Sequence, residues 1–223
     1  RIWKAATLTQ TKAWAKDYQK AQKTLINMEA EDLAEAERNR QSVGSDPGVI
    51  RKWLVLAPIP FTGKTGSEDW QREQIPLEAQ LRPTVGNRAE IAGQGLVWRA
   101  VLIKDSLIDF NLLVGEVTDW SVAYAVSYIW SKTDLTGLQL SIGSDDQAKV
   151  YLNGSEIYCW AEPRLYTPDE DVVSDVTLNV GLNVIVLKVA NEQEQWRSSL
   201  KISEPDGTPV KGIQVTLDPE RDQ

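Results

Sequence analysis

Residues 142–154 read IGSDDQAKVYLNG and carry the strongest local structural signal in the chain. Apolar and polar residues alternate before and after an acidic corner at Asp145 and Asp146, as they do in strands that bury one face. The segment closes with Asn153-Gly154, a pair that type I′ hairpin turns favour because both central residues need positive φ. We therefore predict a β-hairpin here, inside an antiparallel β-sheet.

Similar strand signals follow one another along most of the chain. Turn residues separate them at intervals that are typical of an all-β sandwich rather than of alternating strands and helices. The run 182–189 is almost continuously apolar and β-branched, which predicts a central strand covered on both faces. The expected strands cover residues 53–57, 96–102, 122–131, 138–142, 148–152, 172–178, 182–189, 197–202 and 211–217.

The first part of the chain has a different composition. Residues 1–45 are rich in Ala, Lys, Gln and Glu, and the apolar residues of 14–28 recur at heptad spacing, which predicts an α-helix. This helix could dock on the sandwich, or it could serve as a stalk and form a homodimer through residues 14–28. We expect the sandwich itself to cover 50–218, with a long Gly- and Pro-punctuated surface loop at about 61–95.

Composition excludes several kinds of chemistry. The 223 residues include no histidine and one cysteine, Cys159, so Ser-His-Asp systems, Cys-His systems and ordinary zinc sites are impossible. The net charge of −8 argues against nucleic-acid binding, which needs a basic surface. No run of apolar residues is long enough to cross a membrane. We therefore expect a non-catalytic domain without a cofactor.

Nine tryptophans are many for a chain of this length. We expect Trp53, Trp98 and Trp120, which lie in or beside strands, to belong to the core. Other tryptophans lie near strand ends, where an indole face can stack on a sugar. They and nearby polar residues predict a shallow groove for a carbohydrate or similar polar ligand, formed by Trp130, Trp160, Arg164, Asn191 and Trp196. The alternative is that these tryptophans cap the core and that Arg164 pairs with a nearby carboxylate.

The adjacent carboxylates of Asp145 and Asp146 also allow two interpretations. They could accept backbone N–H groups and fix the hairpin corner, as Asx turns do. They could instead contribute to a Ca²⁺ site, because Ca²⁺ prefers oxygen ligands. The first interpretation is the one that we favour.

Four segments and the tryptophan that follows them resemble the galactose-binding-like jelly-roll family. They are AYAVSY at 123–128, IGSDD at 142–146, KVYLNG at 149–154 and GLNVIVLKV at 181–189, followed by Trp196, and the resemblance covers roughly residues 96–217. It implies an antiparallel jelly-roll sandwich of the kind found beside glycoside hydrolases and in large bacterial surface proteins.

Three other segments, at residues 53–61, 107–110 and 117–120, resemble the C-terminal region of bacterial membrane-anchored serine/threonine protein kinases. That resemblance implies a membrane anchor upstream of this chain and an extracytoplasmic location, although a cytoplasmic one stays open. No kinase motif is present in the sequence. We expect a ligand-recognition or sensory domain of a larger bacterial protein. The alternative is a structural or protein-interaction domain that associates through its helix and binds no small ligand.

Overall fold

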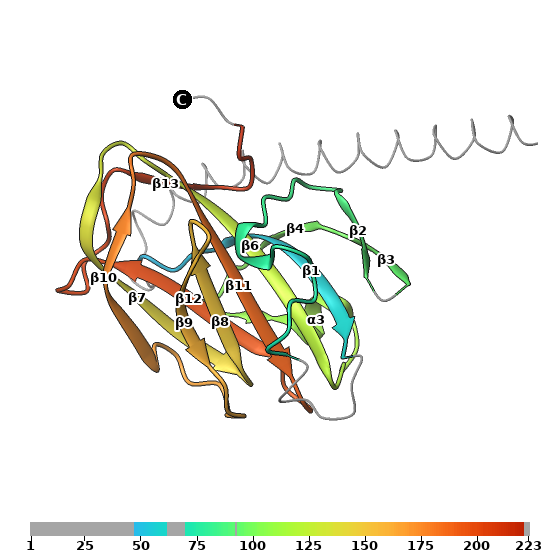
Figure 1. The fold of residues 1–223 in the computed structure, drawn as a ribbon. Coiled ribbons are helices and arrows are strands. Elements are labelled where there is room, and N and C mark those ends of the chain that lie inside the picture. Colours follow the sequence, from blue (N-terminus) through green and yellow to red (C-terminus); the bar gives the residue numbers. More distant parts are fainter. Residues whose placement is uncertain (1–46, 62–69, 92, 221–223) are drawn as a thin grey trace, which may run out of the picture. The chain divides into compact units, whose positions relative to one another are not determined.

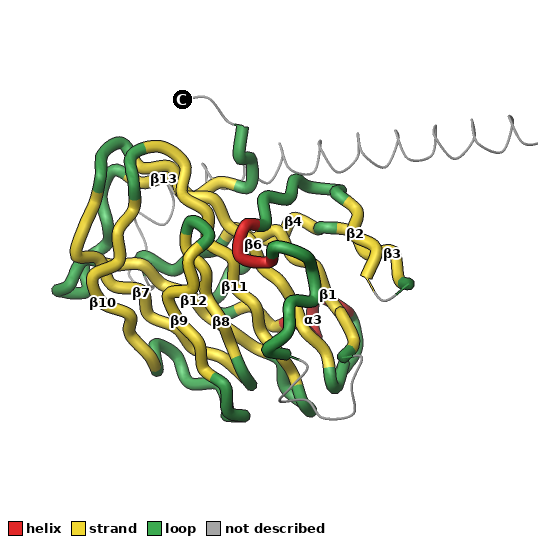
Figure 2. Tube along the Cα trace, viewed as in Figure 1, coloured by secondary structure: helices red, strands yellow, loops and turns green. Residues whose placement is uncertain are grey.

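The computed structural model describes residues 47–61, 70–91 and 93–220, in which antiparallel β-strands predominate (Figures 1 and 2). The predicted helix in 1–45 and its dimerisation segment 14–28 lie outside the described residues. None of the helices in the described ranges has the length and hydropathy that crossing a bilayer requires.

Two main sheets form the domain, and every strand pair in them is antiparallel. The seven-stranded sheet has the order β4 (Arg99–Leu102), β1 (Lys52–Pro60), β6 (Ser121–Ser131), β11 (Gly181–Asn191), β8 (Ala148–Leu152) and β9 (Ser155–Trp160), and β13 (Ile213–Thr216) also pairs with β6. The four-stranded sheet has the order β10 (Asp171–Leu178), β7 (Leu135–Asp145), β12 (Arg197–Ser203) and β5 (Ile108–Asp109). The remaining elements are the hairpin of β2 (Arg88–Ile91) and β3 (Gln94–Val97), the 3₁₀-helix η1 (Glu78–Gln80) and the short helix α3 (Phe110–Val114).

The hairpin predicted from residues 142–154 is present. Asn153 and Gly154 have φ values of 51° and 86°, so both turn residues are left-handed, as a type I′ turn requires. In β7, Leu138, Leu140 and Ile142 are buried at every second position, which is the alternation that the sequence predicts. The turn sets the register of β8 and β9, whereas β7 pairs with β10 and β12 in the other sheet, so the acidic corner leads the chain from one sheet to the other.

The two sheets enclose one apolar core, which confirms a mainly β, sandwich-like fold. The seven-stranded sheet contributes alternate residues of β6 and β11, and the four-stranded sheet contributes those of β7 and β12. Trp196 belongs to this core: it is completely buried and its ring centroid lies 5.1 Å from that of Phe110. The prediction that Trp196 lines a surface groove is therefore wrong.

The region predicted as a surface loop at 61–95 has structure of its own. Residues 70–83, which we call the strap, cross the outer face of the seven-stranded sheet, and β2 and β3 follow them. Tyr128 of β6 donates a hydrogen bond to the Pro83 carbonyl at 2.6 Å, and Lys188 of β11 donates to the Arg72 carbonyl at 2.6 Å. Because these contacts bury the outer face, β6 and β11 are covered on both sides.

A buried ion pair fastens the strap to the sheet. Glu78 of η1 and Lys188 are 2% and 0% exposed, and their charged groups are 2.8 Å apart. The hydroxyls of Tyr124 and Tyr151 also donate to the Glu78 carboxylate, the latter at 2.6 Å. Every charge in the cluster thus has a partner, a condition that buried ions must meet. Burial lowers the pKa of Lys188, and the Glu78 carboxylate opposes that shift.

Replacing Lys188 by methionine should lower the free energy of unfolding by about 3–5 kcal/mol, because the buried Glu78 carboxylate would lose its cationic partner. Lys149 offers a matched control, since it is the register partner of Lys188 on β8. It pairs with the more exposed Glu156 at 3.6 Å and lies over the Trp70 ring of the strap at 5.2 Å, so it contacts the strap without forming a buried ion pair. Lys149→Met should therefore cost about 1 kcal/mol or less. Equal losses in urea unfolding of the two variants would contradict this account of the strap.

Candidate functional site

One end of the sandwich brings together several polar and aromatic residues from separate segments of the chain. We call this end the rim. It comprises the segments 110–120, 145–148, 160–171 and 191–196. Strand register places them together, because Ser121 pairs with Asn191, and Ala148 pairs with both Val189 and Trp160.

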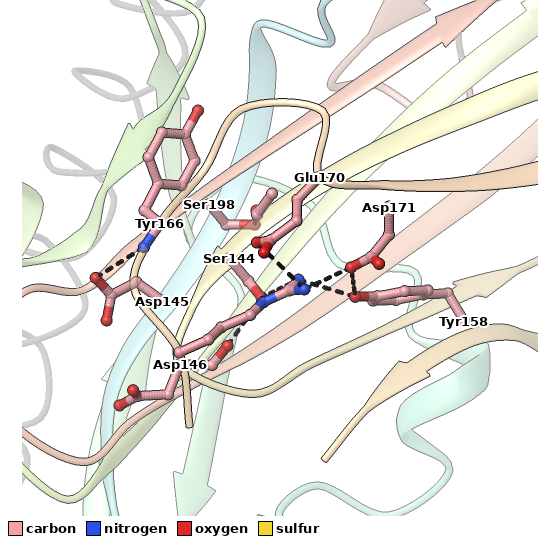
Figure 3. A network of polar contacts seen from close by, with 10 residues as sticks. Ser144, Asp145, Asp146, Tyr158, Tyr166, Glu170, Asp171 and Ser198 are labelled. Carbon is pink, nitrogen blue, oxygen red and sulfur yellow. Dashed lines mark hydrogen bonds and ion pairs between the residues drawn. The ribbon is translucent and has the colours of Figure 1, made fainter. Parts of the chain in front are cut away.

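Arg164 is the centre of a hydrogen-bonded network at the rim. Figure 3 shows its partners Ser144, Tyr158 and Asp171 close together. Its Nη1 lies 2.5 Å from Oδ2 of Asp171 and 3.4 Å from Glu170. Its Nη2 donates to the Ser144 hydroxyl at 2.8 Å and to the Tyr158 hydroxyl at 2.9 Å. A planar guanidinium suits this arrangement because its donors form a rigid fork. The network therefore joins segment 160–171 to β7, β9 and the start of β10.

The same network fixes the protonation state of Asp171. Burial opposes ionisation of this carboxyl group, but hydrogen bonds from Tyr158 and Arg164 outweigh that effect and hold the pKa of Asp171 below its ordinary value. Arg164 thus meets an ionised partner. This confirms the interpretation in which Arg164 pairs with a nearby carboxylate.

Arg164 also positions Trp160. The guanidinium carbon lies 4.8 Å from the centroid of the indole ring, within the range of a cation–π contact. Only 8% of the Arg164 side chain is accessible, whereas Trp160 is 37% exposed. Arg164 therefore holds one part of the indole in place, and Trp160 presents the rest to solvent.

A glycine allows segment 160–171 to pass close to the sheet. A Cβ atom at Gly143 of β7 would lie 2.3 Å from the carbonyl oxygen of Thr167, which is closer than real Cβ atoms approach. The absence of a side chain at Gly143 is thus a condition for the position of Arg164. A glycine inside a strand, as Gly143 is, is a sequence signal that another segment of backbone passes close by.

Both carboxylates of the acidic corner accept backbone N–H groups. Asp145 Oδ2 accepts from Tyr166 at 3.3 Å, and Asp146 Oδ2 accepts from Glu192 at 2.7 Å. These bonds agree with a corner-fixing role for the pair. In the described ranges no three His, Cys, Asp or Glu side chains are grouped so that they could hold a metal ion. The calcium site at Asp145 and Asp146 stays a prediction, which a melting temperature measured with and without chelator would test.

The two carboxyl groups are harder to ionise than usual. Burial raises the pKa of Asp145 to about 6, and repulsion from Asp146 adds to the shift. Burial likewise raises the pKa of Asp146, and Glu192 reinforces that change through its charge. Burial and mutual repulsion thus both oppose ionisation of the corner.

Trp120 is a rim residue that the sequence analysis assigned to the core. It is 42% exposed, whereas Trp53 and Trp98 are buried as predicted. The backbone N–H of Trp120 donates to the Glu192 carbonyl at 3.1 Å, and the backbone carbonyl of Trp120 accepts from the N–H of Phe61 at 2.8 Å. A φ value of 51° turns the chain at this position just before β6 begins. Position next to a strand is the only sequence signal here, and it does not tell which way the ring points.

The other predicted ligand residues have different locations. Asn191 lies at the rim but is completely buried, and its Nδ2 donates to the Thr118 carbonyl at 2.7 Å. Trp130 pairs with Leu182 and Gln214 near the opposite end of β6. It is seven residues from the level of Trp160, which corresponds to about 23 Å along the strand. Of the five predicted residues, the structure brings Trp160 and Arg164 into contact with each other.

Comparisons with known proteins identify no family. A scan against protein-family models finds none that matches, and a search of curated proteins finds no significant similarity. Among solved structures, one that is similar is described as "Structure of a family 35 carbohydrate binding module from an environmental isolate". It is 19% identical, the match covers 41% of this chain and 69% of that one, and the TM-score is 0.30. At that TM-score the similarity carries no argument about function, so the rim is interpreted from its own geometry.

Replacing Asp145 by asparagine should make stability less dependent on pH. Because the folded pKa of about 6 lies above the ordinary value of about 3.9, the folded state binds the proton more tightly. The stability that this contributes is complete below about pH 4 and is lost as pH rises through 6. Asp145→Asn should therefore gain stability relative to the wild-type protein between about pH 4 and pH 7, by the order of 1–3 kcal/mol in urea unfolding.

Asp206→Asn is the matched control with the opposite sign. Hydrogen bonds from the side chain and the N–H of Thr208 hold the pKa of Asp206 below its ordinary value. This variant should lose stability relative to the wild-type protein as pH rises from the acidic range. A pH-independent difference for Asp145→Asn would contradict the assigned environment of the corner.

Proposed function

We propose that this domain recognises a ligand non-catalytically at the rim, and that the ligand is a carbohydrate or a similarly polar molecule that stacks on Trp160 and Trp120. The observation that carries the proposal is the exposure of these two indoles, 37% and 42%, at one end of a sandwich in which Trp53, Trp70, Trp98 and Trp196 are buried. Indole faces bind the apolar faces of sugar rings, and adjacent polar groups bind the hydroxyls.

The strand order defines how far apart the two indoles are anchored. Trp120 precedes β6 and Trp160 ends β9, so three strand spacings separate them across the sheet. Through the register of β9, β8, β11 and β6, Trp160 lies opposite Ala123 of β6. Trp120 is three residues before Ala123, so the two tryptophans are also offset by three residues along the strand direction. These offsets place the two backbones about 17 Å apart. An oligosaccharide of several units covers that span, whereas a monosaccharide does not.

The position of Trp160 supports recognition with little loss of side-chain freedom. Arg164 already restrains the indole through its stack, and Arg164 is itself held by Asp171, Ser144 and Tyr158. A side chain that is held in its binding position before the ligand arrives lowers the entropic cost of binding. We expect Arg164 to act as a positioning residue rather than as a ligand contact.

A protein partner is the second candidate, and exposed aliphatic side chains favour it. Leu112 and Leu165 are 80% and 81% exposed, and Val117 is 68% exposed, all within the rim segments. A contiguous patch of exposed apolar side chains often marks a site of protein association. This candidate corresponds to the structural or interaction role that the sequence analysis left open.

The wider context is also part of the proposal. We propose a sensory or recognition domain of a larger bacterial protein, with the resemblance to membrane-anchored kinases as the basis for an upstream anchor and an extracytoplasmic location. Homodimer formation through residues 14–28 belongs to the same set of proposals. The full-length gene sequence, and sedimentation with and without residues 1–45, would test them.

Calorimetric titration with a panel of oligosaccharides tests the proposal. For a saccharide that binds, Trp160→Ala and Trp120→Ala should each weaken binding about tenfold or more, as loss of an aromatic anchor does. Val180→Ala is a matched control, because Val180 is 60% exposed near Trp130 at the opposite end of β6 and should have no effect.

Leu165→Ser separates the two candidates. It should leave saccharide binding nearly intact, whereas it should weaken association with a protein that docks on the aliphatic side chains. If no class of saccharide binds the wild-type protein, the carbohydrate proposal is wrong. Binding that survives the loss of both indoles would overturn the assigned location.

A further inference from the structure

The rim has an unusual balance of charges. Residues 105–131, 142–148 and 189–196 include no lysine or arginine. The same stretches and the segment that follows Trp160 carry seven carboxylates close to the rim, namely Glu116, Asp119, Asp145, Asp146, Glu162, Glu192 and Glu194. Negative charge gathered in one region raises the local concentration of cationic ligands.

The two arginines at this end already have acidic partners. Arg164 pairs with Asp171 and Glu170, and Arg197 pairs with Asp109 at 3.2 Å. Asp171, Glu170 and Asp109 are additional to the seven carboxylates above. The arginines therefore do not neutralise the rim, and the surplus of negative charge remains.

A second observation comes from Gln147, which directly precedes β8, a strand that lies between β6 and β9 in the sheet. Its side chain is completely buried, and its Nε2 donates to Oε1 of Glu192 at 2.6 Å. A carboxylate can only accept, so this bond fixes the orientation of the amide and leaves Oε1 of Gln147 as the other atom. Within the part of the chain that the structure describes, that oxygen has no hydrogen-bond partner.

Asn191 repeats the pattern on the neighbouring strand. Its Nδ2 donates to the Thr118 carbonyl, which again can only accept, and its buried Oδ1 has no partner among the described residues. Buried polar atoms without partners are costly, and native structures contain few of them. Both of these amide oxygens can only accept, so each lacks a donor, whereas the Tyr166 hydroxyl, which is also buried at the rim without a partner in the described part of the chain, can donate or accept.

Neighbouring negative charges act on both carboxyl groups of the acidic corner. The pKa of Asp145 and that of Asp146 are raised by burial, and each is raised further by the charge of a neighbouring carboxylate. A positive charge placed near the corner would relieve this repulsion. A compact metal ion is the less suitable source, because the described residues offer no group of three ligating side chains. Carboxylates spread over several rim segments that also carry two exposed indoles suit an organic cation, which aromatic rings also attract.

We infer that the rim selects a saccharide that carries a protonated amine, an amino sugar with a free amino group, over a neutral sugar of the same shape. An ammonium group supplies the donors that the amide oxygens lack and the positive charge that the carboxylates lack. The inference rests on the proposed function, since it names the class of carbohydrate that the same site takes.

Three β-1,4-linked tetrasaccharides test it, because they share a backbone and differ only at the second carbon of each ring. They are the tetramers of glucosamine, N-acetylglucosamine and glucose, titrated calorimetrically at a pH at which the amines are protonated. The glucosamine tetramer should bind about tenfold tighter than the neutral ones. This preference should shrink as salt is raised, because salt screens the charges.

Glu192→Gln localises the effect. Glutamine keeps an acceptor for Gln147 and removes one charge, so the variant should lose several-fold in affinity for the glucosamine tetramer and keep its affinity for a neutral tetramer. Glu204→Gln removes one charge after β12, whose last residue Ser203 pairs with Gln139 at the end opposite to the rim. It should change neither affinity.

The outcomes separate the inference from the proposed function. Equal affinities for the three tetramers would overturn the inference and leave carbohydrate recognition in place. A preference that Glu192→Gln and Glu204→Gln reduce equally would also overturn it, because the net charge of the whole protein would then be the cause. If no tetramer binds and the wider panel is also negative, the proposed function itself is wrong.

Discussion

Burial of the central strands β6 and β11 on both faces is the constraint on which the rest of the structure depends. Strands β6 and β11 pack against the four-stranded sheet on one side and lie beneath the strap on the other. A long strand that is covered twice must be apolar almost throughout, and the run 182–189 has that composition. Its one charged residue, Lys188, is tolerated because Glu78 reaches it from the strap. Binding at either face of these central strands would require the domain to open.

The loops at the strand ends can therefore bind a ligand without any opening of the domain. At the rim, polar contacts hold segment 160–171 in a fixed position. Arg164 connects three strands to one indole, and Gly143 lets the segment lie close to β7. Binding sites on loops that a rigid scaffold positions are common, since loops vary while the scaffold keeps its packing. The same carboxylates that fix the corner leave the rim with more negative charge than its cations balance.

Local patterns in the sequence predicted the strands well. The Asn-Gly turn, the alternation in β7 and the continuous apolar run of β11 each state a backbone requirement that neighbouring residues reveal. The same reasoning failed at proline: β1 was expected to end before Pro58, yet it continues to Pro60 with an irregularity between Leu56 and Ile59. Pairing with an irregular register accommodates residues that a regular ladder excludes.

Long-range contacts could not be predicted in this way. Trp120 and Trp196 both precede strands, but Trp120 points to solvent and Trp196 packs on Phe110, so their expected locations were reversed. Glu78 and Lys188 are separated by 110 residues, and no local pattern joins them. The one available signal was Lys188 itself, because a charge inside an apolar strand demands a partner. Asp171 and Tyr158 as partners of Arg164 likewise depend on the crossing over Gly143.

The most direct test of the account is an NMR titration that follows the indole N–H signals of the tryptophans while a binding saccharide is added. The account predicts that the signals of Trp120 and Trp160 shift together and saturate at one ligand concentration. The signals of the core residues Trp53 and Trp196 should stay in place, as should that of Trp130 at the opposite end of β6. Shifts centred on Trp130, or a ligand that binds without moving either rim signal, would contradict the claim that the rim is the recognition site.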